Sequence, residues 1–236
     1  HGAVRRGGAG GVTERGYGQP LLPETGVRLP ATSRWGQVAP AGLMRYRGET
    51  FGAAYVDSLF ACHFNTRRVV NIRLESKNGS FVTKEKDFLT SDSIGFHPTD
   101  ILEDADGSLL LLDTGGWLSW GCPFSKRAMP EIKGSIYRIQ RKDISVRDDP
   151  RGLMLSWNSL NAKDLIYLIN DSRPAVRDKA VETIIGRGEA ILDLMSKLIL
   201  ESSDSIFIKR CLWAVSRIKS KSSLTILQKA LKDSDS

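Results

Sequence analysis

Between residues 40 and 142, apolar and polar positions alternate over short runs that are separated by turn residues. Such alternation predicts β-strands, and Asn78-Gly79 is typical of a tight hairpin turn. The predicted strands form a set of four, "GLMRYRG", "SLFACHF", "RVVNIRLE" and "FVTKEKDFL", and then a set of three, "TDILED", "SLLLLDT" and "GSIYRIQR". These strands are compatible with a sandwich, a barrel or a propeller. The spacing of roughly 50–60 residues between the sets favours about two blades of a β-propeller.

After residue 158 the period changes to that of amphipathic helices. Short helices in pairs, repeating about every 31–33 residues, predict an α-solenoid. Pro174 is placed in the first turn of one helix, with Asp171 or Ser172 as its cap, and Gly186 and Gly188 mark the end of that helix. Arg177 and Arg210 are predicted to take similar places in successive helices. Trp213 lies among apolar positions, which favours packing in the core over a binding role. The fold class is therefore multidomain β plus α, with a partial propeller at 39–142, a linker at 143–158 and a solenoid at 159–236.

The composition of the chain says less about the fold than the pattern of apolar and polar residues does. Residues 1–38 are rich in Gly, Arg and Pro and predict a loop-rich or poorly ordered segment. The net charge of +7 is spread along the chain, which argues against nucleic-acid binding, and no apolar run is long enough to cross a membrane. Of three cysteines, Cys62 and Cys122 are candidates for a disulfide or for buried free thiols. Because the chain begins with His1 rather than Met, we expect a fragment.

Antiparallel strand order predicts which residues share a rim. The link before "TDILED" carries His97, and the two links after the second strands carry Asn65, Arg67 and the long loop 115–133. His97 beside Asp100 could act as a general base for a hydroxyl group, and an Arg could hold an anion. Alternatively, His97 hydrogen-bonds a neighbouring backbone and Asp100 caps a turn.

The loop and the "EDADG" turn offer further candidates. Asp113, Trp117 and Trp120 could contact a sugar or a partner at the rim, or they could shape and pack the loop itself. Asp104 and Asp106 resemble the start of a calcium loop, but an Asp-Gly hairpin turn accounts for them better. The sequence therefore predicts no set of metal ligands.

Two resemblances follow from these motifs. "DSRPAVRDKAVETIIGRG", "IKRCLWAVSRI" and "LQKALKDSDS" resemble HEAT repeats of the short type also found in phycobilin-lyase-like proteins. "APAGLMRYRGETFGAAYVDSLFACHFNTRRVVNIRLE", "FHPTDILEDADGSLLLLDTGGW" and "PEIKGSIYRI" are similar to the membrane-bound dehydrogenases of planctomycetes. Those proteins join a propeller like that of glucose/sorbosone dehydrogenases to HEAT repeats, often with a cytochrome c domain. The resemblance covers roughly residues 39–236.

The resemblance implies a periplasmic or cell-envelope dehydrogenase acting on a sugar or polyol. It implies pyrroloquinoline quinone and calcium as cofactors, and haem on a separate cytochrome c domain or partner reached through the HEAT repeats. At the quinone-contacting positions of related enzymes, however, this chain has Asn65, His97 and Thr99 in place of Lys and Arg, with Arg67 close by. The chain alone is not expected to be active, because the family's catalytic His belongs to an earlier blade. A non-catalytic scaffold that binds glycan or protein is the competing hypothesis, and a bilin lyase-like protein is a third.

Overall fold

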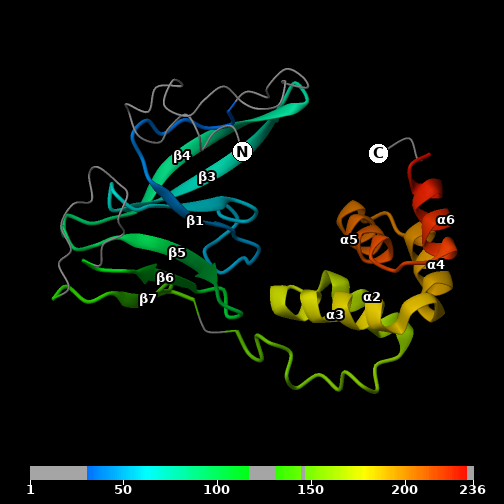
Figure 1. Cartoon of the computed structure of the whole chain (residues 1–236). Helices are drawn as coiled ribbons and strands as arrows, with labels where there is room; N and C mark the ends of the chain where they lie inside the picture. The colour runs from blue at the N-terminus through cyan, green and yellow to red at the C-terminus, as the bar shows by residue number, and fades with distance from the viewer. Residues whose placement is uncertain (1–30, 117–130, 145–146, 233–236) are drawn as a thin grey trace. The chain divides into compact units, whose positions relative to one another are not determined.

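A computed structural model describes residues 31–116, 131–144 and 147–232 (Figure 1). The chain divides into two compact units, His1–Asp143 and Ile144–Ser236, and each is considered by itself below. The first unit contains the strands and the second contains the helices. Among the described residues, no helix has both the length and the apolar character needed to cross a membrane.

The first sheet has four antiparallel strands in sequence order: β1 (Pro40–Arg45), β2 (Leu59–His63), β3 (Arg68–Lys77) and β4 (Ser80–Thr90). Asn78 and Gly79 both have positive φ, 50° and 72°, and they close the long β3–β4 hairpin. This is the backbone geometry that a two-residue hairpin turn requires and that Asn-Gly supplies at low cost. The predicted set of four strands is confirmed.

The second sheet has three antiparallel strands: β5 (Pro98–Glu103), β6 (Leu109–Asp113) and β7 (Ser135–Ile139). Gly107, at φ 82°, turns the chain between β5 and β6, as the Asp-Gly signal predicts. The set of three strands is thus also confirmed. The described residues form these two separate sheets and no closed ring of blades, so a propeller remains a prediction.

The two sheets meet along β1 and β5, which lie side by side in Figure 1. A Cβ atom at Gly42 would lie only 2.4 Å from Asp100 Oδ1, which shows how closely these strands approach. The buried Tyr46 hydroxyl donates to the Gly107 carbonyl at 3.0 Å. Phe60, Ile101 and other apolar side chains fill a common core between the sheets.

The helical unit contains α2 (Ala162–Tyr167), the 3-10 turn η1 (Leu168–Asn170), α3 (Pro174–Arg187), η2 (Gly188–Ile191), α4 (Leu192–Glu201), α5 (Ser205–Ser216) and α6 (Lys221–Ala230). Its core is separate from that of the sheets and is built from apolar faces of the helices, with Leu165, Ile184, Met195 and Val215 all fully buried. The predicted change to helices after residue 158 is therefore confirmed, and the α-solenoid remains a prediction.

Three details of the helical prediction are wrong. Arg173 takes the cap position of α3, while Asp171 binds the Arg173 side chain instead of capping the helix. The cap of α5 is Asp204, 31 residues after Arg173, so Lys179 and not Arg177 corresponds to Arg210. Trp213 was predicted to pack in the core but is 64% exposed, because Cys211, Ala214 and Val215 already fill the buried face of α5.

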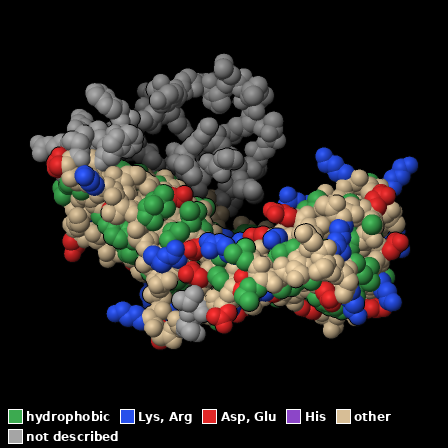
Figure 2. All heavy atoms as spheres, turned by 90° about the horizontal axis from the view of Figure 1, so that it is seen from below, with side chains coloured by type: hydrophobic (Ala, Val, Ile, Leu, Met, Phe, Trp, Pro, Cys, Tyr) green, Lys and Arg blue, Asp and Glu red, His purple; other side chains and the backbone are tan. Residues whose placement is uncertain are grey.

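Surface charge is mixed on the face shown in Figure 2, where basic and acidic side chains alternate with apolar ones. The net charge of +7 is therefore not gathered into one basic field on that face.

Candidate functional site

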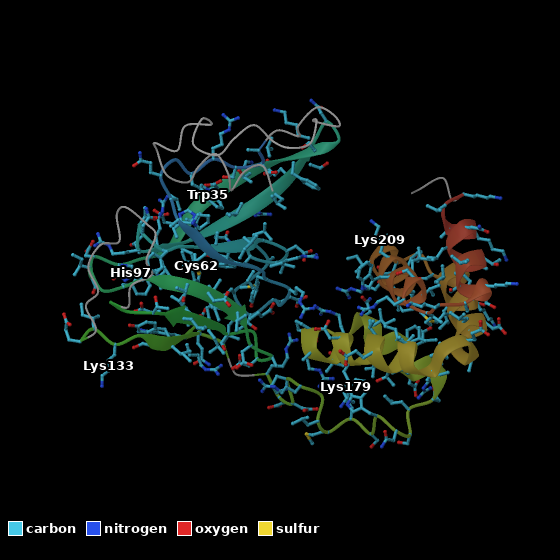
Figure 3. All side chains as sticks on the ribbon, in the orientation of Figure 1. Trp35, Cys62, His97, Lys133, Lys179 and Lys209 are labelled. Carbon is cyan, nitrogen blue, oxygen red and sulfur yellow. The ribbon has the colours of Figure 1, made fainter. Side chains whose placement is uncertain are left out.

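His97 lies just before β5, at the same end of the sheets as Lys133 (Figure 3). Its ring stacks on that of Phe64, which follows β2, with centroids 4.6 Å apart and planes at 29°. Nδ1 lies 2.6 Å from the Gly115 carbonyl oxygen. Because a carbonyl only accepts, Nδ1 must carry the proton, and in the neutral ring Nε2 is then the basic nitrogen.

Asp113 fixes the backbone around His97. The residue is 8% exposed, and its Oδ1 accepts hydrogen bonds at 2.8 Å from the backbone nitrogens of both His97 and Gly115. The Thr114 backbone nitrogen in turn donates to the His97 carbonyl at 3.1 Å. Asp113 therefore joins the residue before β5 to the start of the long loop, and it binds the backbone of Gly115, whose carbonyl contacts the His97 ring.

The ends of the loop are also held together. The Gly116 backbone nitrogen donates to the Ile132 carbonyl at 3.0 Å, and Gly134 packs against the backbone of Asp113 and Thr114. Of the residues predicted on this loop, Trp117, Trp120 and Cys122 lie outside the described residues. The structure thus brings Phe64, His97 and the base of the loop to one end of the sheets.

The residues expected to hold a quinone are engaged within the fold. Asn65 accepts from the Ala39 backbone nitrogen at 2.8 Å and donates to the Gln37 carbonyl at 2.9 Å. Thr99 donates to the Leu112 carbonyl at 3.2 Å. These side chains do not fit a charged quinone, because both already use their polar groups to join segments of the β unit.

Arg67 differs from these two residues. It has a φ of 54°, a conformation that costs energy for a side chain of this size, and its Nε atom is buried without a hydrogen-bond partner. The residue is half-buried and stands in the turn that also carries Phe64. The strained backbone and the unsatisfied Nε set Arg67 apart from Asn65 and Thr99, whose polar groups serve the fold.

Asp100 is not joined to His97. Its Oδ1 accepts from the Ile101 backbone nitrogen at 2.9 Å and lies against Gly42 of β1. Burial, and secondarily the nearby Asp100 carboxylate, raise the pKa of the Cys62 thiol to about 12. Cys62 is a buried free thiol, and so is Cys211. The carboxylate that supports His97 is therefore Asp113 rather than the predicted Asp100.

The "EDADG" turn does not fit a calcium ion. Arg138 contacts the carboxylates of Asp104 at 2.8 Å and Asp106 at 3.2 Å, and Asp106 also accepts from Ser108. An Arg side chain at this position supplies the countercharge that a cation would supply. Among the described residues, no group of three or more His, Cys, Asp or Glu side chains could hold a metal ion.

A second histidine was missed by the sequence analysis. His63, at the end of β2, is fully buried, and its ring centroid lies 4.6 Å from that of Trp35. Arg68 Nε donates to His63 Nδ1 at 3.2 Å, and Glu85 accepts from Trp35 Nε1 at 2.8 Å. In the sequence, His63 is a polar residue at the end of an apolar strand. The alternation of apolar and polar residues places it at the strand terminus and does not predict that it is buried.

Comparison with protein-family models and with curated proteins returns no match. Among solved structures, the chain is similar to the crystal structure of an oxidoreductase (glucose dehydrogenase) from Thermus thermophilus, with a TM-score of 0.34 and 15% sequence identity. The match covers 52% of this chain and 31% of that one, so it spans about a third of the length of that structure.

Proposed function

We propose that this chain is part of an oxidoreductase acting on a sugar or polyol, with His97 as the group that takes the hydroxyl proton of the substrate. In this proposal the two sheets are neighbouring blades of a propeller and the helices are HEAT-like repeats. The observation that carries it is the fixed tautomer of His97, whose Nδ1 faces the Gly115 carbonyl at 2.6 Å and leaves Nε2 basic.

Oxidation of an alcohol removes a proton from oxygen and two electrons, as a hydride equivalent, from carbon. His97 Nε2 is suited to the proton, because the Phe64 stack and the Gly115 contact hold the ring in one orientation. The hydride goes to a two-electron acceptor, which no residue of this chain is proposed to hold. Exposed Ile206 and Trp213 on α5 support a docking role for the helices, with an electron-accepting cytochrome domain as the partner.

The test is a His97→Gln variant of the protein in its natural full length. Gln keeps a donor for the Gly115 carbonyl but has no basic nitrogen, so we expect kcat to fall by about 10²–10⁴-fold. Activity is measured over a panel of sugars and polyols with a dye as artificial acceptor. Lys86→Gln, at an exposed position of β4, is the control and should retain full activity.

A non-catalytic scaffold is the second candidate, and the hydrogen bonds of Asn65 and Thr99 support it, since both side chains serve the fold. Binding of a glycan with no dye reduction for any substrate would favour this candidate. Equal activity of His97→Gln and the natural protein would exclude the proposed proton transfer.

A further inference from the structure

The positive charge of the helical unit is concentrated in its last two helices. Residues 205–232, which contain α5 and α6, include seven Lys and Arg residues and no Asp or Glu. Residues 144–204, which precede them in the same unit, include eight basic and ten acidic residues. A local excess of one sign attracts a partner of the opposite sign, which a mixed surface does not.

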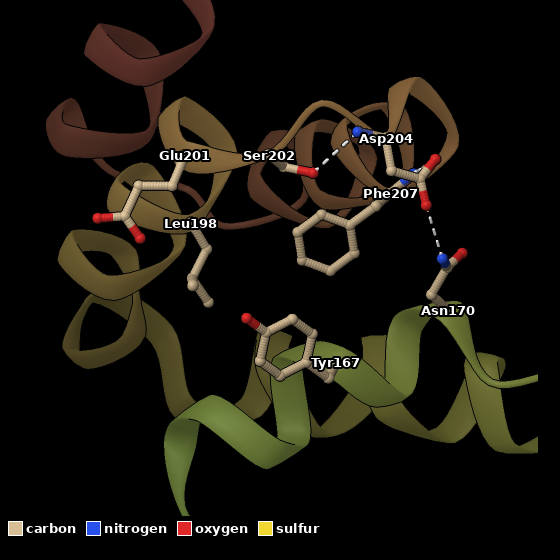
Figure 4. Close-up of a pocket in the computed structure, with 7 residues that line it drawn as sticks. All are labelled: Tyr167, Asn170, Leu198, Glu201, Ser202, Asp204 and Phe207. Carbon is tan, nitrogen blue, oxygen red and sulfur yellow. Dashed lines mark hydrogen bonds between the residues drawn. The ribbon is translucent and has the colours of Figure 1, made fainter.

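The inner side of α5 is fixed by the core of the unit. Phe207 stacks on Tyr167 with ring centroids 5.7 Å apart, beside a cavity of about 230 Å³ (Figure 4), and Val215 is fully buried further along the helix. Asp204, the N-cap, accepts from the α5 backbone and, at 2.9 Å, from the Asn170 side chain. The helix is therefore held at its start and along its length, and its outer side is a rigid surface.

Apolar and basic side chains alternate on that outer side. Ile206, Lys209, Trp213 and Arg217 follow one another at i, i+3, i+7 and i+11, which places them in one row along the helix. Ile206 and Trp213 are 56% and 64% exposed, and both basic side chains are exposed as well. These four residues are called the α5 stripe below.

The basic residues of the α5 stripe are available to a partner. Among the residues that the structure describes, Lys209 and Arg217 form no ion pair, and neither do the exposed Lys219 and Lys221 that follow in the turn to α6. Lys197 of α4, in contrast, lies 3.9 Å from a carboxylate of its own helix. A carboxylate of another chain can therefore bind the stripe without displacing an internal partner.

We propose that the α5 stripe binds an acidic segment of a partner protein. Asp or Glu side chains of that segment pair with Lys209 and Arg217, and an apolar side chain packs on Trp213. Trp and Arg are among the residue types that contribute most to binding between proteins, and complementary charge adds specificity and a faster encounter. An electron-accepting domain is proposed above to dock on the same helix, but this inference does not depend on that function.

The alternation favours a protein over other polyanions. Single-stranded nucleic acid stacks on aromatic rings and pairs with cations, but it has no aliphatic side chain for Ile206. A helix that lies on an anionic membrane separates a continuous apolar face from its charged face, whereas α5 turns its continuous apolar face to the core. A segment that alternates acidic and apolar side chains complements the stripe in both respects.

The experiment titrates the peptide acetyl-Glu-Leu-Glu-Glu-Leu-Glu-amide into the ¹⁵N-labelled chain and follows the α5 amides by NMR. Matched peptides replace every Glu by Gln, which removes the charge, or by Lys, which reverses it. We expect saturable shifts with a Kd on the order of 1 mM for the acidic peptide at low salt, and weaker binding as salt screens the charges. Absence of saturation, or equal binding of the Gln peptide, would overturn the proposal.

Two variants separate the charge from the ring. Lys209→Gln combined with Arg217→Gln should weaken binding of the acidic peptide about tenfold, and Trp213→Ser should weaken it about three- to fivefold. Lys163→Gln combined with Lys197→Gln removes the same net charge from exposed positions of α2 and α4, and it should bind like the natural chain. Unchanged affinity in both stripe variants, or an equal loss in the control, would contradict the assignment.

A third arm compares the other polyanions on the same protein. Phosphatidylcholine vesicles with and without phosphatidylserine are tested by co-sedimentation, and a thymidine oligonucleotide is tested by NMR. We expect neither to bind in a way that depends on Lys209 and Arg217. Sedimentation with the phosphatidylserine vesicles that the double variant abolishes would assign the stripe to a membrane. Saturation by the oligonucleotide at a lower concentration than by the peptide would assign it to nucleic acid, and either result would refute an acidic protein segment.

Discussion

The His63 imidazole is enclosed by Trp35, Arg68 and the strands around it, and this makes it a source of pH dependence. Burial, and then the Arg68 guanidinium, lower the pKa of His63, although Glu85 and Asp87 act in the opposite direction. Arg68 donates to Nδ1, so the proton of the neutral ring is on Nε2, which is buried and has no hydrogen-bond partner. Protonation therefore takes place at Nδ1, against the Arg68 guanidinium, and it leaves a charged ring whose Nε2 has no acceptor.

The sign of the effect follows from linkage. Unfolded His63 binds a proton near its ordinary pKa of 6.5, whereas the folded chain binds it only at lower pH. Stability is thus full above 6.5 and is lost as the pH falls toward and through the folded pKa. We expect the free energy of unfolding, from urea titrations at pH 7 and pH 5, to fall less for His63→Leu than for the natural chain. An identical fall in both, with Lys86→Gln as control, would rule out this role of His63.

The positions of residues in the fold were predicted better than the contacts that their side chains make. Strand order correctly placed Asn65 and His97 at the ends of their strands, because alternation and turn signals are local. Whether a side chain is free for a ligand depends on neighbours far away in sequence, and Asn65 meets Gln37 and Ala39 only after the chain folds. His63 and Trp35 escaped notice for the same reason, since their contact joins segments that carry no shared pattern.

At the scale of elements, the accuracy of the sequence-based prediction depended mostly on turns and helix caps. Asn78-Gly79 and Gly107 were readable because few residues tolerate positive φ. The alignment of α3 with α5 could not be predicted from the charged residues, because Arg177 and Arg210 look equivalent in sequence. The cap positions Arg173 and Asp204 show that the two helices are offset by another number of residues. Apolar residues on α5 exceed what one face can bury, so periodicity alone could not predict which of them is exposed.

The end of α3 offers a direct test of backbone conformation. A Cβ at Gly186 or at Gly188 would meet nothing within 4 Å, but Gly188 has a φ of 61° and Gly186 lies inside the helix. Gly186→Ala should stabilise the helical unit by about 0.5–1 kcal/mol, because Ala loses less entropy in a helix. Gly188→Ala should destabilise it by about 1–3 kcal/mol. Thermal unfolding followed by circular dichroism measures both, and the same sign for the two variants would contradict this interpretation.

For the whole molecule, the central feature is that the buried apolar residues of the β unit and those of the helical unit form separate clusters. Ile101 belongs to the apolar cluster between the sheets, and Ile184 belongs to the cluster of the helical unit. Both side chains are fully buried. Units with separate cores can open separately, and hydrogen exchange reports the free energy of each opening.

Matched truncations therefore should act on one unit each. Ile101→Ala and Ile184→Ala remove the same atoms from sites of the same burial, at a cost of about 2–5 kcal/mol to the unit concerned. Hydrogen exchange read by mass spectrometry should show faster exchange in β5 and β6 for the first variant and in α3 and α4 for the second. Faster exchange in both units for either variant would mean that the sheets and the helices unfold as one cooperative body, and the division at residue 143 would then describe the architecture but not the energetics.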